Sequence, residues 1–391
     1  MSVTYPRGFV AAGATAGLKA SGRPDVALVV NEGPRTDAAA VFTSNRVFAA
    51  PVAWSQEAVA DGRLDAVILN SGGANAATGA PGFQDAHATA EHVATVLQEQ
   101  GRDVSPVDVA VCSTGLIGER LPMPVLCAGI DTAAAALAED GGADAAVAIM
   151  TTDTVAKTVA LDGDGWRIGG MAKGAGMLAP GMATMLCVIT TDAVVSATVA
   201  QHALQEAVRV TLNRLDSDGC MSTNDTVLLL ASGASGVEPT PQAFQEALTA
   251  ACAELTQQLL TDAEGASHDI AIRVQGATSE DAAEAVARAV ARSNLFKAAI
   301  FGKDPNWGRV IAAVGTVPES VAPFDATALD VHINGVHVCK GAGVGEPRTL
   351  VNLEPRAVDV LIELHAGDAS ATVWTNDLTH DYVHENSAYS T

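Results

Sequence analysis

Short apolar runs separated by polar turns dominate the first half of the chain, and they predict buried strands. Each run is rich in Val, Ile and Ala and is bounded by Gly, Asp or Asn. One stretch, residues 85–100, instead carries apolar side chains at helical spacing and is followed by Gly101, a residue that favours helix ends. The predicted strands are residues 25–31 (DVALVVN), 38–43, 65–70 (DAVILN) and 107–113.

The second half of the chain combines amphipathic helices with alternating strands. Ser196, Thr240 and Ser279 each precede a stripe of apolar residues at helical spacing, as N-cap residues do. The alternation over residues 269–275 predicts a half-buried strand. Two β-hairpins are also predicted, because a turn dipeptide separates two alternating runs in each. They are residues 329–338, turning at Asn334 and Gly335, and residues 358–374, turning at Gly367 and Asp368.

These elements predict an α/β protein of the α+β type, in which helices sandwich mixed β-sheets, because helices follow paired strands without regular βαβ alternation. A chain of 391 residues is too long for one ordinary core. We expect one large domain over about residues 1–276 and a smaller α/β domain over about residues 277–391. The polar tail after residue 376 holds Tyr382 and Tyr389. We expect it to dock and to return to the active site.

The charge balance narrows the range of partners. Acidic residues outnumber basic ones by 45 to 22, and no cluster of Lys or Arg stands out. Nucleic acid and anionic membranes are therefore excluded as partners, whereas a cationic substrate would be attracted. The 6 cysteines form no C-x-x-C pair and no metal-ligand spacing with histidine, so we expect neither a disulfide scaffold nor a metal site. No secretory leader or membrane span is recognisable, and we expect a cytoplasmic protein.

The segment 169–191, GGMAKGAGMLAPGMATMLCVITT, carries the most specific chemical signal. A glycine-rich loop leads through Pro180 to Thr184, the first residue of an apolar run that predicts a strand. If the bond between Ala183 and Thr184 is cut, the threonine gains its own base, a free α-amino group. The same glycines fit the dinucleotide pattern G-x-G-x-x-A, but Pro180 and Gly181 interrupt the helix that such a site requires. We therefore interpret Thr184 as a nucleophile.

Other polar loops supply partners for such a nucleophile. Thr114 and Gly115 follow the strand ending at Ser113, and a hydroxyl beside a closely approaching backbone N–H is suited to bind an oxyanion. Loops 70–79, 216–226 and 301–309 hold more Asn, Asp and Gly than connectors need. The chain lacks G-x-S-x-G and the phosphate-binding G-x-x-x-x-G-K-[ST] pattern, which argues against a serine hydrolase and a P-loop enzyme.

Collinear motifs over essentially the whole chain resemble the ornithine acetyltransferase family, also called glutamate N-acetyltransferase, of arginine biosynthesis. In chain order the motifs are RGFVAAG, NSGGANAATG, CSTGLIG, IMTTDT, GGMAKGAGMLAPGMATML, STNDT, DAEGA, FGKDPNWGR and NDLTHDYVHENSAYST. The chain departs from the family pattern at Gly73, where Asn is usual, at Ala77, where Cys is frequent, and at residues 375–377, where Gly-Cys-Asp is usual. These departures bear on loop packing more than on chemistry.

The resemblance implies that the precursor cleaves itself between Ala183 and Thr184. The products are an α chain of residues 1–183 and a β chain of residues 184–391, assembled as an α2β2 heterotetramer. Thr184 then transfers acetyl from N2-acetyl-L-ornithine to L-glutamate by a ping-pong mechanism through an acetyl-threonine, without a cofactor or metal. Thr114 and Gly115 form the oxyanion hole. The implied substrate-binding residues are Thr151 or Thr152, Lys173, Thr184, Glu264, Asn386 and Thr391.

Three alternatives stay open at this point. The residues do not decide whether acetyl-CoA is a second acetyl donor and hence a co-substrate. A threonine amidohydrolase or aminopeptidase would use the same self-generated nucleophile, with water in place of glutamate. A non-catalytic protein that stays uncut and only binds an amino acid would need none of this chemistry.

Overall fold

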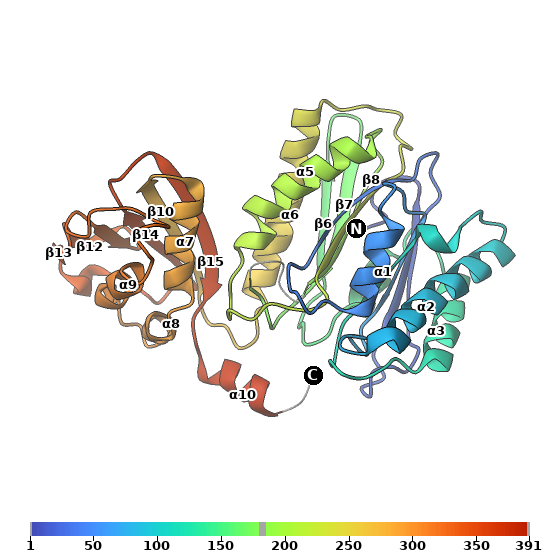
Figure 1. Ribbon diagram of the computed structural model, residues 1–391, viewed down its shortest axis with the longest axis horizontal. Helices are drawn as coiled ribbons and strands as arrows, with labels where there is room; N and C mark the ends of the chain where they lie inside the picture. Colours follow the sequence, from blue (N-terminus) through green and yellow to red (C-terminus); the bar gives the residue numbers. More distant parts are fainter. Residues whose placement is uncertain (1, 180–184, 389–391) are drawn as a thin grey trace.

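The computed structural model describes residues 2–179 and 185–388, and its chain forms three mixed β-sheets with helices around them (Figure 1). The first sheet has the order β1-β2-β4-β5, in which β4 and β5 run parallel and the other neighbours antiparallel. The second has the order β3-β9-β8-β7-β6, in which β8 and β9 are the parallel pair. The strands are β1 (Phe9–Ala14), β2 (Val26–Asn31), β3 (Asp37–Phe42), β4 (Ala66–Asn70), β5 (Val109–Ser113), β6 (Lys157–Asp162), β7 (Arg167–Lys173), β8 (Leu186–Thr191) and β9 (Thr226–Ala231).

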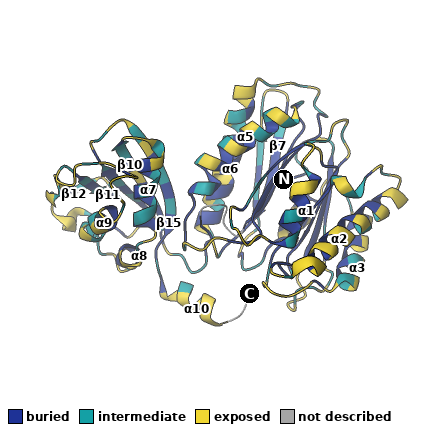
Figure 2. Ribbon diagram, in the orientation of Figure 1, coloured by how far each residue is buried: buried dark blue, intermediate teal, exposed yellow. Residues whose placement is uncertain are grey.

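These two sheets pack face to face and form a four-layer sandwich with helices outside. Apolar side chains from both inner faces make one core, which also takes in the short helix α4 (Gly142–Ala148). Helices α2 (Gly79–Glu99) and α3 (Met123–Ala135) cover the outer face of the first sheet, and α5 (Ala197–Val210) and α6 (Pro241–Thr261) cover that of the second. Figure 2 shows the buried strands between helices whose outer faces are exposed. Because both faces are covered, the strands read as continuous apolar runs.

Helix α1 (Ala50–Ala58) closes the open edge of the first sheet at β5. Trp54 donates its indole N–H to the Val109 carbonyl, at 2.9 Å, and Ser55 donates its hydroxyl to the Val111 carbonyl, at 2.7 Å. Unpaired strand edges are otherwise sites of aggregation. These side chains therefore satisfy the edge of the strand that leads to Thr114.

The third sheet forms a separate layer near the C-terminal end of the chain and has the order β13-β12-β11-β14-β10-β15. Helices α7, α8 and α9 pack against it around their own apolar core, and α10 follows its last strand. The elements are β10 (Asp269–Ala277), α7 (Glu280–Ala291), α8 (Asn294–Phe301), α9 (Trp307–Val314), β11 (Asp330–Ile333), β12 (Val336–Lys340), β13 (Gly343–Val344), β14 (Ala357–Glu363), β15 (Ala369–Asn376) and α10 (His380–Ala388).

The local signals read from the sequence are mostly confirmed. The side chains of Ser196, Thr240 and Ser279 each accept a backbone N–H from the first turn of their helix, as N-caps do. The hairpin of β11 and β12 turns at Asn334 and Gly335 with φ of +46° and +81°, as a type I′ turn requires. Helix α2 begins six residues before the predicted start, at Gly79.

The second predicted hairpin, over residues 358–374, is wrong. Strands β14 and β15 are not neighbours, because β10 lies between them, parallel to β14 and antiparallel to β15. The turn at Gly367 passes over the end of β10, where the N–H groups of Ala366 and Gly367 both donate to the Gly276 carbonyl. Alternation and turn residues predict that two strands are joined, but they do not show whether a distant strand is inserted between them.

The structure also excludes a dinucleotide fold at the glycine-rich segment. Strand β7 before the segment and β8 after it are antiparallel neighbours, and no helix lies between them in the described part of the chain. A dinucleotide site requires a helix at this place. A search of the described residues found no helix with the length and apolar character needed to cross a membrane.

Candidate active site

One cavity of about 120 Å³ collects the residues that the sequence singled out. Its walls come from the loops after β4, β5 and β7, the segment between α4 and β6, the loop before β9, the turn after α6, and helix α10. Ala183, Thr184 and Thr391 lie outside the described residues. Every other predicted site residue lines the cavity, namely Thr114, Gly115, Thr151, Thr152, Lys173, Glu264 and Asn386.

The turn after β5 presents a hydroxyl and a backbone N–H together. Thr114 is fixed by two backbone hydrogen bonds of 3.0 Å, from its N–H to the Asn70 carbonyl and from the Gly73 N–H to its own carbonyl. Gly115 has φ of +133°, and a Cβ there would lie 2.8 Å from the Gly73 nitrogen, so only glycine fits. Among the described residues the Gly115 N–H has no acceptor.

Lys173, the last residue of β7, is buried in the wall of the cavity. The residue is 1% exposed, and its Nζ donates to Thr114 Oγ1 at 3.3 Å. Burial lowers the pKa of Lys173, and the Asp153 carboxylate acts in the opposite direction. A cation held in so little water gains most from an anionic group bound beside it. The hydroxyl that accepts from this ammonium keeps its own proton to donate.

Asp153 is a buried residue whose carboxylate acts on Lys173, and it was not among the predicted site residues. Its Oδ1 accepts the Gly174 N–H at 2.7 Å and the Lys157 ammonium at 2.6 Å, and its Oδ2 accepts the Thr151 N–H at 2.9 Å. Burial works to raise the pKa of Asp153, but Lys173 and Lys157 outweigh it and lower the pKa to about 2. Asp153 thus joins two loops of the cavity. Its only signal in the sequence is its place in the IMTTDT motif.

Glu264 adds a carboxylate to the lining of the same cavity. Its Oε1 accepts the Thr152 hydroxyl at 2.7 Å, and its Oε2 accepts the Asn386 amide at 2.9 Å. Its backbone N–H donates to the Ala175 carbonyl at 2.9 Å. A Cβ at Gly176 would lie 2.4 Å from Oε2, so the glycine leaves room for this carboxylate. Of the two candidate threonines, Thr152 is the one whose hydroxyl bonds Glu264.

The segment before β9, predicted only as a polar loop, joins the loops that line the cavity through hydrogen bonds. The Asn224 amide donates to the Ala74 carbonyl at 2.6 Å and to the Ser113 carbonyl at 2.8 Å. The neighbouring Asp225 is buried and accepts the Met185 N–H at 3.0 Å. Burial raises the pKa of Asp225 well above its usual value. The STNDT motif holds both residues, but nothing in their local spacing shows that they bridge distant loops.

The segment before β9 also binds the glycine-rich loop after β7. Met177 has φ of +57°, and its N–H donates to Asp218 Oδ2 at 2.7 Å. The carbonyl of Leu178 accepts the Ser217 N–H at 2.6 Å. Residues 217–225 therefore bind the chain on both sides of the undescribed stretch 180–184.

A second, larger cavity of about 550 Å³ adjoins the first and shares Thr152 and Glu264 with it. Its lining is acidic, with the carboxylates of Asp262, Asp381 and Glu385. Burial raises the pKa of Glu385, and the nearby Glu264 adds to this effect. This arrangement attracts a cationic group to the Glu264 side of the site.

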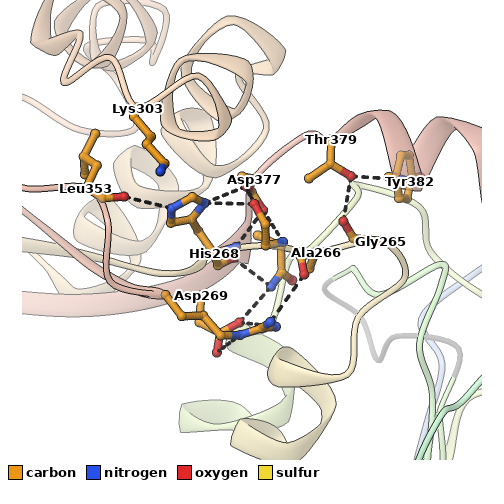
Figure 3. A network of polar contacts seen from close by, with 12 residues as sticks. Gly265, Ala266, His268, Asp269, Lys303, Leu353, Asp377, Thr379 and Tyr382 are labelled. Atoms are coloured by element: carbon orange, nitrogen blue, oxygen red, sulfur yellow. Dashed lines mark hydrogen bonds and ion pairs between the residues drawn. The ribbon is translucent and has the colours of Figure 1, made fainter.

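The tail that carries Asn386 is docked through the polar network in Figure 3. Asp377 Oδ1 accepts the N–H groups of Ser267 and His268, each at 2.9 Å, and its Oδ2 lies 2.7 Å from His268 Nδ1. The Thr379 hydroxyl donates to the Gly265 carbonyl at 2.6 Å and accepts the Tyr382 N–H at 2.9 Å. These contacts hold the start of the tail against residues 265–268.

His268 is placed between two acceptors in this network. Its Nδ1 faces the Asp377 carboxylate, and its Nε2 lies 3.1 Å from the Leu353 carbonyl. The contact of His268 with Asp377 joins the turn after α6 to the point where the chain leaves β15 for the tail.

A family model and the curated relatives agree on one protein family. The model of the ArgJ family matches residues 10–391. The arginine biosynthesis bifunctional protein ArgJ of Streptomyces coelicolor is 60% identical over 390 residues, which cover 100% of each chain. The protein of the same name from Thermobifida fusca is 61% identical over 391 residues, again 100% of each chain.

Solved structures are also similar. The ornithine acetyltransferase of Mycobacterium tuberculosis, complexed with ornithine, is 60% identical over 46% of this chain and 94% of that chain, with a TM-score of 0.45. A β-aminopeptidase from Burkholderia is 16% identical over 67% of this chain and 85% of that chain, with a TM-score of 0.43.

Proposed function

The chain belongs to the ArgJ family, and on this premise we propose that it transfers acetyl from N2-acetyl-L-ornithine to L-glutamate in arginine biosynthesis. The products are L-ornithine and N-acetyl-L-glutamate. The relatives are named bifunctional, so the same site also acetylates glutamate from acetyl-CoA. The observation that carries the proposal is that all described members of the predicted site line one cavity.

The enzyme first generates its nucleophile by cutting itself between Ala183 and Thr184. The Thr184 hydroxyl attacks the Ala183 carbonyl, the amide C–N bond breaks as an ester forms, and water hydrolyses that ester. The new α-amino group has an ordinary pKa of about 7.7 to 8.0, so a useful fraction is neutral near pH 7. Support comes from the flanks, where Asp218 holds Met177 and Asp225 holds Met185.

The first half-reaction forms an acetyl-threonine. The α-amino group takes the hydroxyl proton of Thr184 as its oxygen attacks the acetyl carbonyl carbon of acetylornithine. The Thr114 hydroxyl and the Gly115 N–H stabilise the oxyanion, a role supported by their adjacency and by the fact that this N–H has no acceptor among the described residues. The C–N bond then breaks, the α-ammonium returns the proton to the leaving amine, and ornithine departs.

The second half-reaction reverses these steps with a new amine. The amino group of glutamate attacks the acetyl-threonine ester, the same oxyanion hole is used, and N-acetylglutamate leaves as Thr184 recovers its proton. Lys173 binds the α-carboxylate that ornithine and glutamate share. Glu264, with Thr152 and Asn386 around it, binds the side-chain ammonium of ornithine. The adjoining acidic cavity favours the same cation.

The remaining parts of the proposal concern organisation. A large domain to about residue 276 and a smaller one after it share the site, which follows the logic of N-terminal-nucleophile enzymes. The α and β chains assemble as an α2β2 heterotetramer in the cytoplasm. The small-molecule substrates are its only other partners.

Acceptor dependence tests the proposal. Purified protein should release ornithine from acetylornithine at a rate that rises steeply with added glutamate, and acetyl-CoA with glutamate should yield N-acetylglutamate. Equal release without any amine acceptor would instead identify a hydrolase. On a denaturing gel the wild type should run as two fragments and Thr184→Ala as one chain. A wild type that stays uncut and inactive would identify a binding protein.

A further inference from the structure

A second cluster of chemically active side chains lies in the third sheet, outside the cavity. Asp330 and Glu363 stand directly opposite each other on the antiparallel strands β11 and β14. His365 follows Glu363 by two residues, with φ of +53°, and His337 comes from the neighbouring strand β12. None of these residues takes part in the proposed acetyl transfer.

The ligand atoms of this cluster converge. His365 Nε2 lies 2.9 Å from Asp330 Oδ2 and 3.8 Å from Glu363 Oε2, and His337 Nε2 lies 3.4 Å from Asp330 Oδ1. One ligand atom each from Asp330, Glu363 and His365 lie within 4.8 Å of one another. Ligands that surround Zn²⁺ at about 2 Å are roughly 3.5 Å apart, so small side-chain rotations suffice for coordination.

The two opposed carboxylates of the cluster favour a bound cation. Like charges directly opposite each other on paired strands destabilise a sheet. Asp330 and Glu363 occupy such positions, and no arginine or lysine forms an ion pair with either carboxylate among the described residues. The two imidazoles are the only side chains of the described chain in ion-pair range of them.

His337 supplies an independent observation. Its Nε2 is buried and has no hydrogen-bond partner among the described residues, although it faces Asp330. Buried polar nitrogens are rarely left without a partner in folded proteins. A ring nitrogen 3.4 Å from Asp330 Oδ1, at the border of the cluster, is suited to add to the coordination of a metal held there.

We propose that Asp330, Glu363 and His365, with His337 beside Asp330, form a binding site for a divalent transition metal of the Zn²⁺ class. A donor set of imidazole and two carboxylates is one that Zn²⁺ accepts, whereas Mg²⁺ and Ca²⁺ prefer oxygen ligands alone. The metal joins β11 to the end of β14 and neutralises the opposed carboxylates, which makes it a structural site. The cysteine spacing that argued against zinc in the sequence has no bearing on this His–carboxylate cluster.

Metal titration of the full-length, tag-free and chelator-treated protein tests the site. Calorimetry at pH 7.5 should show one tight Zn²⁺ per chain, and Zn²⁺ but not Mg²⁺ should raise the Tm, because a ligand that binds only the folded state stabilises it. Co²⁺ should give the visible absorption of a tetrahedral centre. If the histidines serve only as protonated partners, the Tm will respond to pH but not to Zn²⁺, and the proposal fails.

Variants assign the binding to these residues. Glu363→Gln and His365→Asn should each weaken Zn²⁺ binding by roughly tenfold or more while acetyl transfer is kept. Asn tolerates the left-handed backbone at position 365, so the fold should persist. His92→Gln is the matched control, because His92 pairs with Asp131 at 2.7 Å without a third ligand. Unchanged Zn²⁺ affinity in both cluster variants would place the metal elsewhere and overturn the proposal.

Discussion

The two sides of the candidate active site are built very differently. On the sandwich side, Thr114 and Lys173 sit at the ends of strands and are 2% and 1% exposed. On the tail side, Asn386 is an exposed residue of a nine-residue helix that has no buried residues. The tail is held by a small polar network around Asp377, whereas the strand ends are embedded in two apolar cores. Groups that stabilise charge require the rigid side, and recognition tolerates the looser one.

The largest effect should come from the rigid side, at the predicted oxyanion hole. Thr114→Ala removes one of two donors and should lower kcat by roughly 10²- to 10³-fold, with a much smaller change in KM. Steady-state assays with acetylornithine and glutamate give both parameters. Thr114→Ser keeps the hydroxyl and should retain most of the activity. Equal losses in both variants would show that the hydroxyl does not act in the transition state.

Lys173 tests whether the rigid side also binds the shared carboxylate. Lys173→Met keeps the length of the side chain without its charge and should lower kcat/KM for both acetylornithine and glutamate by roughly 10- to 100-fold, as expected for a lost charged hydrogen bond. Lys303→Met is the control, because Lys303 pairs with Glu354 at the surface. An effect on one substrate only would contradict a common carboxylate site.

The tail side should show a smaller effect, confined to binding. Asn386→Ala removes one hydrogen bond to Glu264, worth about 1 kcal/mol, so KM for acetylornithine should rise by roughly fivefold with kcat retained. Ser387→Ala on the same helix is the control and should behave as wild type. A large fall in kcat in Asn386→Ala would mean that the tail takes part in the chemistry, and the contrast between the two sides would disappear.

The smallest effect should concern stability alone. Burial, aided by the neighbouring Asp108, raises the pKa of Asp65 to about 6 from its unfolded value of 3.8. The folded state therefore binds more protons between these pH values, and this carboxyl lowers stability as pH rises from about 4 to 6. Asp65→Asn should raise the unfolding free energy by about 1 kcal/mol at pH 7, allowing for solvent screening, and by little at pH 4.

Denaturant unfolding at both pH values measures this difference, and acetyl transfer should be unchanged. Asp164→Asn, at an exposed position in another part of the chain, provides the control. A stability gain that is equal at pH 4 and pH 7 would rule out titration of Asp65 as its cause.

The sequence could predict the features that depend on interactions between residues close together in the chain. Strand and helix positions and the caps at Ser196, Thr240 and Ser279 depend on neighbouring residues, and local patterns show them. The insertion of β10 between β14 and β15 joins segments roughly ninety to a hundred residues apart, which alternation does not encode. The convergence of the site was expected only through the family motifs.

The supporting polar residues could not be assigned from the sequence for the same reason. Asp153, Asn224 and the pair of His268 with Asp377 act by joining distant loops. Each lies within or beside a motif, but a motif gives the residue and not its partner. Their positions follow only from the packing of three sheets.

The strand order of the second sheet has a consequence for the proposed cut. Strands β8 and β9 follow residue 184, yet they lie between β3 and β7, which both precede residue 183. Two strands of the β chain therefore lie between strands of the α chain in one hydrogen-bonded sheet. Separating them would require stripping β9 from β3 and β8 from β7 and opening both apolar cores. After the cut, the α and β chains should therefore copurify through every step that does not denature the protein.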